Sequence, residues 1–122
     1  MPEKPGTDSF VYDPMYPVPS QGGNMATLSP SFQNGSVDQS NIEMRNDVLV
    51  YSTAPLKESV ENAGPVKVSM YVSSDAKDTD LTIKLIDVYP YGKAYNLDES
   101  IQRVRWRNGL GEACFHATRS RL

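Results

Sequence analysis

Apolar and polar side chains alternate along the middle of the chain with the period of two that a β-strand produces. Residues 66–73 place an apolar side chain at every second position, at Val66, Val68, Met70 and Val72. This alternation is typical of a strand with one buried face and one exposed face. Residues 81–89 carry apolar side chains on both faces, namely Leu81, Ile83 and Leu85 on one and Ile86 and Val88 on the other. We therefore predict two strands joined by an acidic turn, the second being a central strand covered on both sides.

Three further stretches have the composition of strands. Residues 47–51 form a short β-branched and aromatic run, residues 93–97 form another short run, and residues 101–107 alternate again. Residues 56–62 fit either a single helical turn or a loop. About five strands, with turn signals roughly 8–12 residues apart, are typical of a β-sandwich or barrel. The predicted fold class is therefore all-β.

The first 46 residues lack this alternation and are rich in proline and glycine, and the pairs Gly22-Gly23 and Asn34-Gly35 predict turns. Residues 12–19 read Tyr-Asp-Pro-Met-Tyr-Pro-Val-Pro, and proline both fixes φ and removes a backbone donor. Because its tyrosine and valine side chains need cover, we expect an extended segment lying on another surface and not a flexible linker. We predict three parts: an extended wrapping segment at 1–46, β-sandwich strands at 47–107, and an atypical tail at 108–122, for which disorder is one interpretation.

The charge is unevenly distributed along the 122 residues. Residues 1–102 hold 7 of the 12 Lys and Arg and 14 of the 15 Asp and Glu, whereas residues 103–122 hold five Arg and Glu112. A basic end can indicate a nucleic-acid or membrane-surface tail. Three of these arginines alternate on a predicted strand without the interleaved aromatic residues of a base-stacking platform. We therefore expect no nucleic-acid partner.

Membrane and redox chemistry are also constrained by composition. No apolar run approaches the ~20 residues of a membrane helix, and the first residues lack the basic-then-apolar order of a signal peptide. The one cysteine, Cys114, cannot form a disulfide within the chain. We expect no membrane partner, and the cytoplasm is the default localisation.

A complete hydrolytic site is not expected within these residues. A serine nucleophile needs a base and an orienting acid within hydrogen-bond reach. The only histidine is His116, in the atypical tail, and no Gly-x-Ser-x-Gly elbow occurs. We therefore assign no catalytic residue, no cofactor and no metal.

Three acidic residues cluster in the turn between the two best strands: Asp75, Asp78 and Asp80. Oxygen ligands at close spacing can hold Ca²⁺. Aspartate is also favoured in turns because its carboxylate accepts hydrogen bonds from nearby backbone N–H groups. Because the spacing of a calcium loop is missing, we favour the structural role.

Asp87 falls on a predicted strand face with apolar neighbours, where an unpaired carboxylate would be costly to bury. We expect Arg103 or Arg105 to pair with it across the strands, in a structural and not a catalytic role. Three tyrosines near the following turn, Tyr89, Tyr91 and Tyr95, fit either packing at strand ends or stacking on a sugar. The tripeptide Asn34-Gly-Ser36 matches a glycosylation acceptor but better fits a turn.

Many short motifs, in order and at compatible spacing, resemble one known family. They are Tyr12-Asp-Pro, Pro17-Val-Pro-Ser20, Gly22-Gly23, Asp38-Gln39, Arg45, Asp47-Val-Leu-Val-Tyr-Ser52, Gly64, Val72-Ser-Ser-Asp-Ala76, Asp78-Thr-Asp80, Lys84-Leu85, Asp87-Val-Tyr-Pro90, Ile101, Arg103 and Arg105. The set, over about residues 8–107, resembles the C-terminal domain of X-prolyl dipeptidyl-peptidases and cocaine-esterase-like acyl hydrolases.

This resemblance implies a galactose-binding-like jelly-roll β-sandwich that follows an α/β-hydrolase domain in a longer parent chain. The implied role is to dock on that catalytic domain, to help shape the mouth of its active site and to contribute to homo-oligomer contacts. The Ser, Asp and His of the triad would lie outside these residues. By position, the loop of Met25, Ala26, Thr27 and Leu28 would form the rim of the acyl pocket. The alternative is a stand-alone β-sandwich module that binds carbohydrate or peptide.

The sequence departs from the family pattern in two places. Pro90-Tyr-Gly92 and Asp98-Glu-Ser-Ile101 stand where the family usually has Pro-Asp-Gly and Asp-Gly-Ile turns. After Arg107, residues 108–122 show no strand pattern where the family continues through further strands. We interpret this stretch as a truncated or out-of-frame end. A sandwich without those strands would expose open sheet edges, so we expect the isolated chain to be aggregation-prone or only partly ordered.

Overall fold

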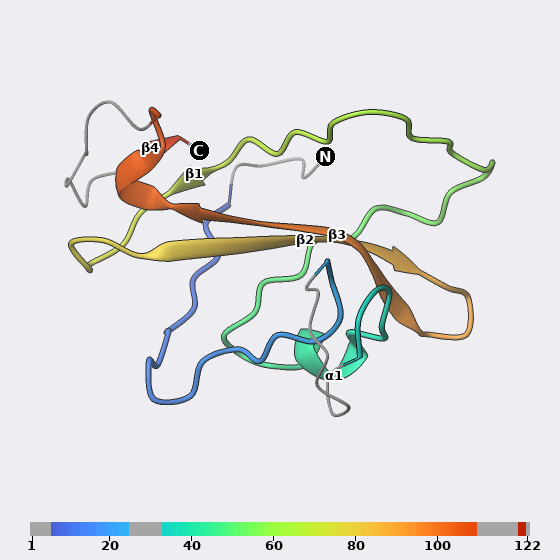
Figure 1. The fold of residues 1–122 in the computed structure, drawn as a ribbon, viewed down its shortest axis with the longest axis horizontal. Helices are drawn as coiled ribbons and strands as arrows, with labels where there is room; N and C mark the ends of the chain where they lie inside the picture. Colours follow the sequence, from blue (N-terminus) through green and yellow to red (C-terminus); the bar gives the residue numbers. More distant parts are fainter. Residues whose placement is uncertain (1–5, 25–32, 110–119, 122) are drawn as a thin grey trace. The chain divides into compact units, whose positions relative to one another are not determined.

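The computed structural model describes residues 6–24, 33–109 and 120–121. Its regular elements are one short α-helix, one 3₁₀ helix and four strands: α1 (Ser40–Glu43), β1 (Tyr71–Val72), β2 (Asp80–Val88), β3 (Ala94–Arg103), η1 (Val104–Trp106) and β4 (Ser120–Arg121) (Figure 1). Strands supply most of the regular structure, and α1 has only four residues. The predicted all-β class is therefore confirmed, whereas the jelly-roll arrangement stays a prediction.

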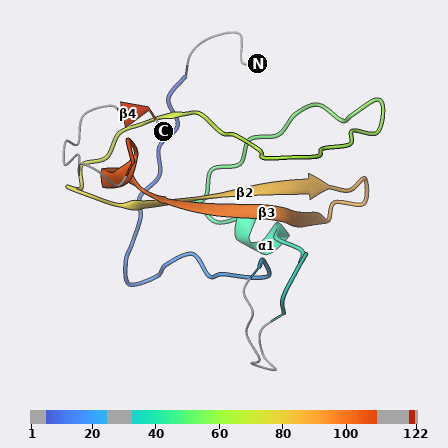
Figure 2. The ribbon, with the colours of Figure 1, turned by 45° about the horizontal axis from the view of Figure 1, so that its top comes forward.

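The longest regular feature is the hairpin of β2 and β3, which run alongside each other (Figure 2). Its turn is closed by the N–H of Tyr89, which donates to the Lys93 carbonyl at 2.8 Å, and by the N–H of Gly92, which donates to the Tyr89 carbonyl at 2.9 Å. Gly92 has a φ of +83°, a conformation that glycine adopts without the steric cost of a Cβ. The predicted strand at 81–89 and the predicted turn after it are confirmed.

The two strands predicted at 93–97 and 101–107 differ from what is observed. Residues 94–103 form the single strand β3, and residues 104–106 form η1. Asp98-Glu-Ser-Ile101 contains no glycine or proline that would break the strand, so β3 continues through it. Among the described residues β2 has β3 as its one strand neighbour, and the Val88 side chain is 58% exposed. Among the described residues, the prediction that β2 is a central strand covered on both sides is therefore not confirmed.

The other predicted strands are shorter or missing. Of residues 66–73 only Tyr71–Val72 are strand, as β1, which pairs antiparallel with β4 through Tyr71 opposite Arg121 and Val72 opposite Ser120. Residues 47–51 are irregular, and residues 56–62 form a loop without a helical turn. Alternation alone produces a strand only where a neighbouring strand accepts and donates the ladder hydrogen bonds, and such a neighbour is not observed for these residues.

The chain divides into two compact units: Met1–Leu56 with Leu85–Asp98, and Lys57–Lys84 with Glu99–Leu122. In the first unit the buried apolar side chains are Val37, Ile42 and Ala94, beside the buried polar residues Gln39 and Asn96. None of the described residues that are fully buried belongs to the second unit. That unit is held by the β1–β4 pair and by polar contacts where β2 begins and β3 ends.

Candidate functional site at the base of the 24–34 segment

Two glycines close the base of residues 24–34. The N–H of Gly23 donates to the Gly35 carbonyl at 2.8 Å, and the N–H of Gly35 donates to the Gly23 carbonyl at 2.9 Å. Both have positive φ, +88° for Gly23 and +82° for Gly35, which residues with a Cβ rarely adopt. We call this pair the Gly23–Gly35 bridge. The predicted pocket-rim residues Met25, Ala26, Thr27 and Leu28 belong to the enclosed segment and lie outside the described residues.

A buried amide connects the bridge to β3. The Asn96 side chain is 3% exposed, and its Oδ1 accepts a hydrogen bond from the N–H of Val37 at 2.7 Å. Its Nδ2 donates to the carbonyl of Gly35 at 3.3 Å. The Asn96 amide therefore holds both the Gly23–Gly35 bridge and the backbone of Val37, two residues after it. Because Asn96 belongs to β3, the hairpin positions the base of the segment.

Gln39 adds a second buried amide to the same network. Its side chain is 1% exposed, and its Nε2 lies 2.9 Å from the Gln21 carbonyl, 3.1 Å from the Val37 carbonyl and 3.2 Å from Oδ1 of Asn96. Its backbone N–H donates to the Ala94 carbonyl at 2.7 Å. No buried side-chain nitrogen or oxygen of the described residues lacks a hydrogen-bond partner. A fully satisfied polar network of this kind is rigid, because any displacement leaves a polar group unpaired at a cost.

Gly22 lies against this network at a distance that only glycine allows. Its φ is +73°, and a Cβ at this position would lie 2.6 Å from the Gly35 carbonyl oxygen and 3.0 Å from Oδ1 of Asn96. The Gly22-Gly23 pair was predicted to mark a turn. The structure adds a second reason for it, which is the close approach of the residue 22 backbone to the Gly23–Gly35 bridge.

Asp38 fixes the start of α1 and the start of β3. Its Oδ1 accepts from the N–H of Ser40 at 3.1 Å and from the N–H of Ala94 at 3.2 Å, and its Oδ2 lies 2.6 Å from Nζ of Lys93. The Lys93 ammonium, then the Ser40 hydroxyl and the Ala94 N–H, hold the pKa of Asp38 well below its ordinary value. Sequence reasoning did not single out Asp38 for this role. The signal that was present is an aspartate two residues before a serine, the spacing of an Asx turn.

Arg45 anchors the proline-rich segment to the same unit. Its guanidinium donates to the Tyr16 carbonyl at 2.9 Å and pairs with the Asp47 carboxylate, with Nη2 2.6 Å from Oδ2. Arg45 lowers the pKa of Asp47 because a hydrogen-bonded cation favours the ionised carboxylate. The 12–19 segment is therefore held through its backbone, whereas the Tyr12 and Tyr16 side chains are 54% and 74% exposed.

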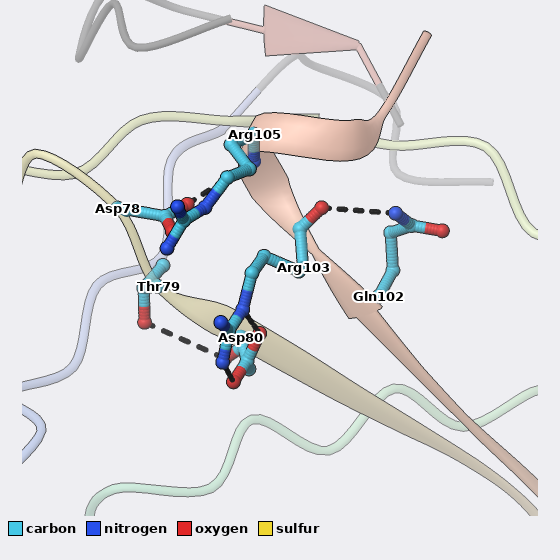
Figure 3. A network of polar contacts seen from close by, with 6 residues as sticks. All are labelled: Asp78, Thr79, Asp80, Gln102, Arg103 and Arg105. Atoms are coloured by element: carbon cyan, nitrogen blue, oxygen red, sulfur yellow. Dashed lines mark hydrogen bonds and ion pairs between the residues drawn. The ribbon is translucent and has the colours of Figure 1, made fainter. Parts of the chain in front are cut away.

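Two ion pairs lie where β2 begins and β3 ends: Asp80 of β2 pairs with Arg103 of β3, and Asp78, just before β2, pairs with Arg105 of η1 (Figure 3). Nε of Arg103 donates to Oδ1 of Asp80 at 2.7 Å, and Nη2 of Arg103 donates to Oδ2 of Asp80 at 2.7 Å. The Asp78 carboxylate accepts from the side chain of Arg105 at 2.5 Å and from its backbone N–H at 3.1 Å. Arg103 lowers the pKa of Asp80, and Asp80 raises that of Arg103.

The predicted partner of these arginines was wrong. Asp87 is exposed on β2, and the structure pairs Arg103 with Asp80 and Arg105 with Asp78. The antiparallel register explains the difference, because each residue forward along β2 is matched by one residue back along β3. Asp80 with Arg103 and Lys84 with Glu99, an ion pair at 3.4 Å, both fit the same register. A structural role for Asp75, Asp78, Asp80, Asp87, Arg103 and Arg105 stays a prediction. Among the described residues no group of acidic, His or Cys side chains could hold a metal ion.

The three tyrosines near the hairpin turn contact one another. The ring centroids of Tyr89 and Tyr91 are 5.3 Å apart, and those of Tyr89 and Tyr95 are 5.4 Å apart with the rings edge to face. Desolvation, followed by the nearby Tyr95 and Tyr89, raises the pKa of Tyr91. Mutual packing at a strand end is the arrangement expected of the structural interpretation.

The described residues cannot assemble a Ser–His–Asp site, because the single histidine, His116, lies outside them. In the part of the chain that the structure describes, no helix is long and apolar enough to span a bilayer.

Comparison with known proteins points to the same family as the motifs. Residues 6–114 match the family described as the X-Pro dipeptidyl-peptidase C-terminal non-catalytic domain. The chain is also 48% identical over 103 residues to a cocaine esterase from Rhodococcus sp. (strain MB1 Bresler), a match that covers 84% of this chain and 18% of that protein. The chain therefore spans less than a fifth of the length of this relative. No solved structure matches it significantly.

Proposed function

Because this chain belongs to the family of X-Pro dipeptidyl-peptidase C-terminal non-catalytic domains, we propose that it supports a hydrolase catalytic domain of the α/β type and partly covers its active site. The chemistry of that catalytic domain would be acyl transfer to water through a serine-centred acyl-enzyme, on an ester, an amide or an X-Pro peptide. The contribution of this chain would be binding and shape, since the family that it matches is described as non-catalytic.

The observation that carries the proposal is the Gly23–Gly35 bridge. A pocket rim must hold its position to select a substrate, and displacement of about 1 Å at a reacting centre can cost about 10²-fold in rate. The bridge, with Asn96 behind it, fixes both ends of the segment that contains Met25 and Leu28. Through Asn96, the β2–β3 hairpin thereby holds the base of this segment.

Exposed apolar side chains of the proline-rich segment support a docking role. Val11, Met15 and Tyr16 are 85%, 80% and 74% exposed although the backbone of the segment is held by Arg45. Ordered apolar side chains without cover are typical of a surface that binds another domain. We propose that this segment lies on the catalytic domain, and that the assembled parent also makes homo-oligomer contacts.

A chimera tests this function. The chain would replace the matching region of the Rhodococcus cocaine esterase, and ester hydrolysis would be measured as kcat and KM. We expect an active chimera in which Leu28→Ala and Met25→Ala raise KM. The matched controls are Leu56→Ala and Met44→Ala, whose side chains are 68% and 78% exposed and which should leave KM unchanged. If the chimera is active and the Leu28 and Met25 variants behave as their controls do, the pocket-rim role is refuted.

The exposure of two rings in the tyrosine cluster is the observation behind one alternative, a module that binds carbohydrate. Tyr91 is 67% exposed and Tyr89 is 42% exposed, and such rings can stack on a sugar face. Binding of the 122-residue chain to a glycan array decides between the two functions. A domain that only supports a catalytic domain should bind no glycan through Tyr91. Saturable binding that is lost in Tyr91→Ala would favour the module.

A further inference from the structure

The Gly23–Gly35 bridge includes the glycine of the dipeptide Asn34-Gly35. An asparagine followed by glycine can cyclise: the backbone nitrogen of the glycine attacks Cγ of the asparagine, and the amide group leaves as ammonia together with the proton of that nitrogen. Water then opens one of the two C–N bonds of the succinimide to give aspartate or isoaspartate. Glycine favours the reaction because it has no side chain to obstruct the ring.

The nucleophile of this reaction is the group that the bridge holds. The Gly35 nitrogen donates its proton to the Gly23 carbonyl at 2.9 Å, and the Gly35 carbonyl accepts from Gly23 and from Asn96. Cyclisation would require this nitrogen to lose its proton and turn toward the Asn34 side chain, which is incompatible with the bridge. Asn34 itself is exposed, so water can reach the ring once it forms.

We propose that Asn34 is a site of spontaneous deamidation, with water as the only reagent, and that its rate is set by opening of the Gly23–Gly35 bridge. Isoaspartate inserts an additional methylene into the backbone next to Gly35 and adds a negative charge. The two bridge hydrogen bonds and the Asn96 bond cannot then all be remade. Modification at Asn34 thus makes an opening of the segment's base permanent. This inference does not depend on the proposed function.

The chain contains its own control, the dipeptide Asn108-Gly109. The Gly109 nitrogen donates to the Trp106 carbonyl at 2.9 Å, and Gly109 has a φ of +105°. That bond spans three residues of a turn next to η1, and Asn108 is exposed. The Gly35 bond instead joins segments twelve residues apart and is supported by the buried Asn96. Local openings are easier in short surface turns than in regions with buried partners.

The experiment follows deamidation of the 122-residue chain at neutral pH by peptide mass mapping, with isoaspartate separated from aspartate. In concentrated urea we expect Asn34 and Asn108 to react within about twofold of each other. In native buffer Asn34 should react at least about tenfold more slowly than Asn108. In native buffer, amide hydrogen exchange at Gly35 should be slower than at Gly109 by the same factor, because exchange and deamidation both need release of the glycine N–H.

Two variants test the control by the bridge. Asn96→Ala removes the whole side-chain amide, whereas Asn96→Asp keeps an acceptor for the Val37 N–H but replaces the Nδ2 donor to Gly35 with a carboxylate oxygen. Both should accelerate deamidation at Asn34 by at least about tenfold. An unchanged rate at Asn108 shows that each variant remains folded around η1. Equal native rates at the two asparagines, or no acceleration at Asn34 in either variant, would overturn the proposal.

Discussion

Replacement of Asn96 by alanine should destabilise the first compact unit more than any ordinary surface change. Oδ1 of Asn96 accepts from the buried Val37 N–H at 2.7 Å, and alanine leaves that donor without its partner. An unsatisfied buried donor costs about 1–3 kcal/mol. The bonds to Gly35 and Gln39 are lost as well, but both groups keep other partners, so the two losses together add about 1 kcal/mol. The expected loss of unfolding free energy is about 2–4 kcal/mol.

Native-state hydrogen exchange measures this loss in the unit concerned. The amides of Gly23, Gly35 and Val37 should exchange roughly 30-fold to 1,000-fold faster in Asn96→Ala, because about 1.4 kcal/mol corresponds to a factor of ten. Asn62→Ala is the matched control, since Asn62 is exposed in an irregular segment and its replacement should change stability by less than about 0.5 kcal/mol. If both variants show the same exchange at these amides, the buried network does not hold the segment's base.

Three other predictions concern backbone strain, pH and association. Gly22→Ala should lower the thermal midpoint, because the position has a φ of +73° and its Cβ would meet a carbonyl oxygen at 2.6 Å, whereas Gly64→Ala, with nothing within 4 Å, should show the effect of positive φ alone. Because Arg103 lowers the pKa of Asp80, the ion pair stabilises the fold above the ordinary aspartate pKa of about 3.9 and its contribution is lost as pH falls through the lowered value. The difference in urea midpoint between the unmodified chain and Asp80→Asn should accordingly be present at neutral pH and shrink in acid; a difference that grows in acid would contradict the pairing. Finally, the exposed apolar side chains should make the isolated chain self-associate, so light scattering that shows a monomer at all concentrations would be evidence against an uncovered docking surface.

Features encoded by neighbouring residues were predictable. The strand from Asp80 to Val88 and its turn follow from apolar alternation and from Pro90-Tyr-Gly92, all of which act within a few residues. The family could also be identified because its motifs are short and ordered. By contrast, residues 47–51 have strand composition without strand structure, since a strand also requires a partner that composition does not supply.

Pairings between distant residues were not predictable. Arg103 or Arg105 was expected to pair with Asp87 of β2. The structure instead pairs Arg103, the last residue of β3, with Asp80, and Arg105 in η1 with Asp78. Which aspartate faces which arginine depends on register, and a register is set by the turn geometry together with every ladder hydrogen bond. The sequence alone shows which types of residue can pair, but it does not show which residues stand opposite one another.

The base of the 24–34 segment shows the same division most clearly. The sequence determined that Gly22-Gly23 and Asn34-Gly35 are turn-forming pairs, because glycine alone adopts their backbone conformations freely. Only the tertiary structure decided that the two pairs face each other and that Asn96, some 59 residues after Val37, holds them. The physical reason is that an amide has no preferred partner in sequence. It becomes a structural element only when folding excludes water and leaves one set of donors and acceptors within reach.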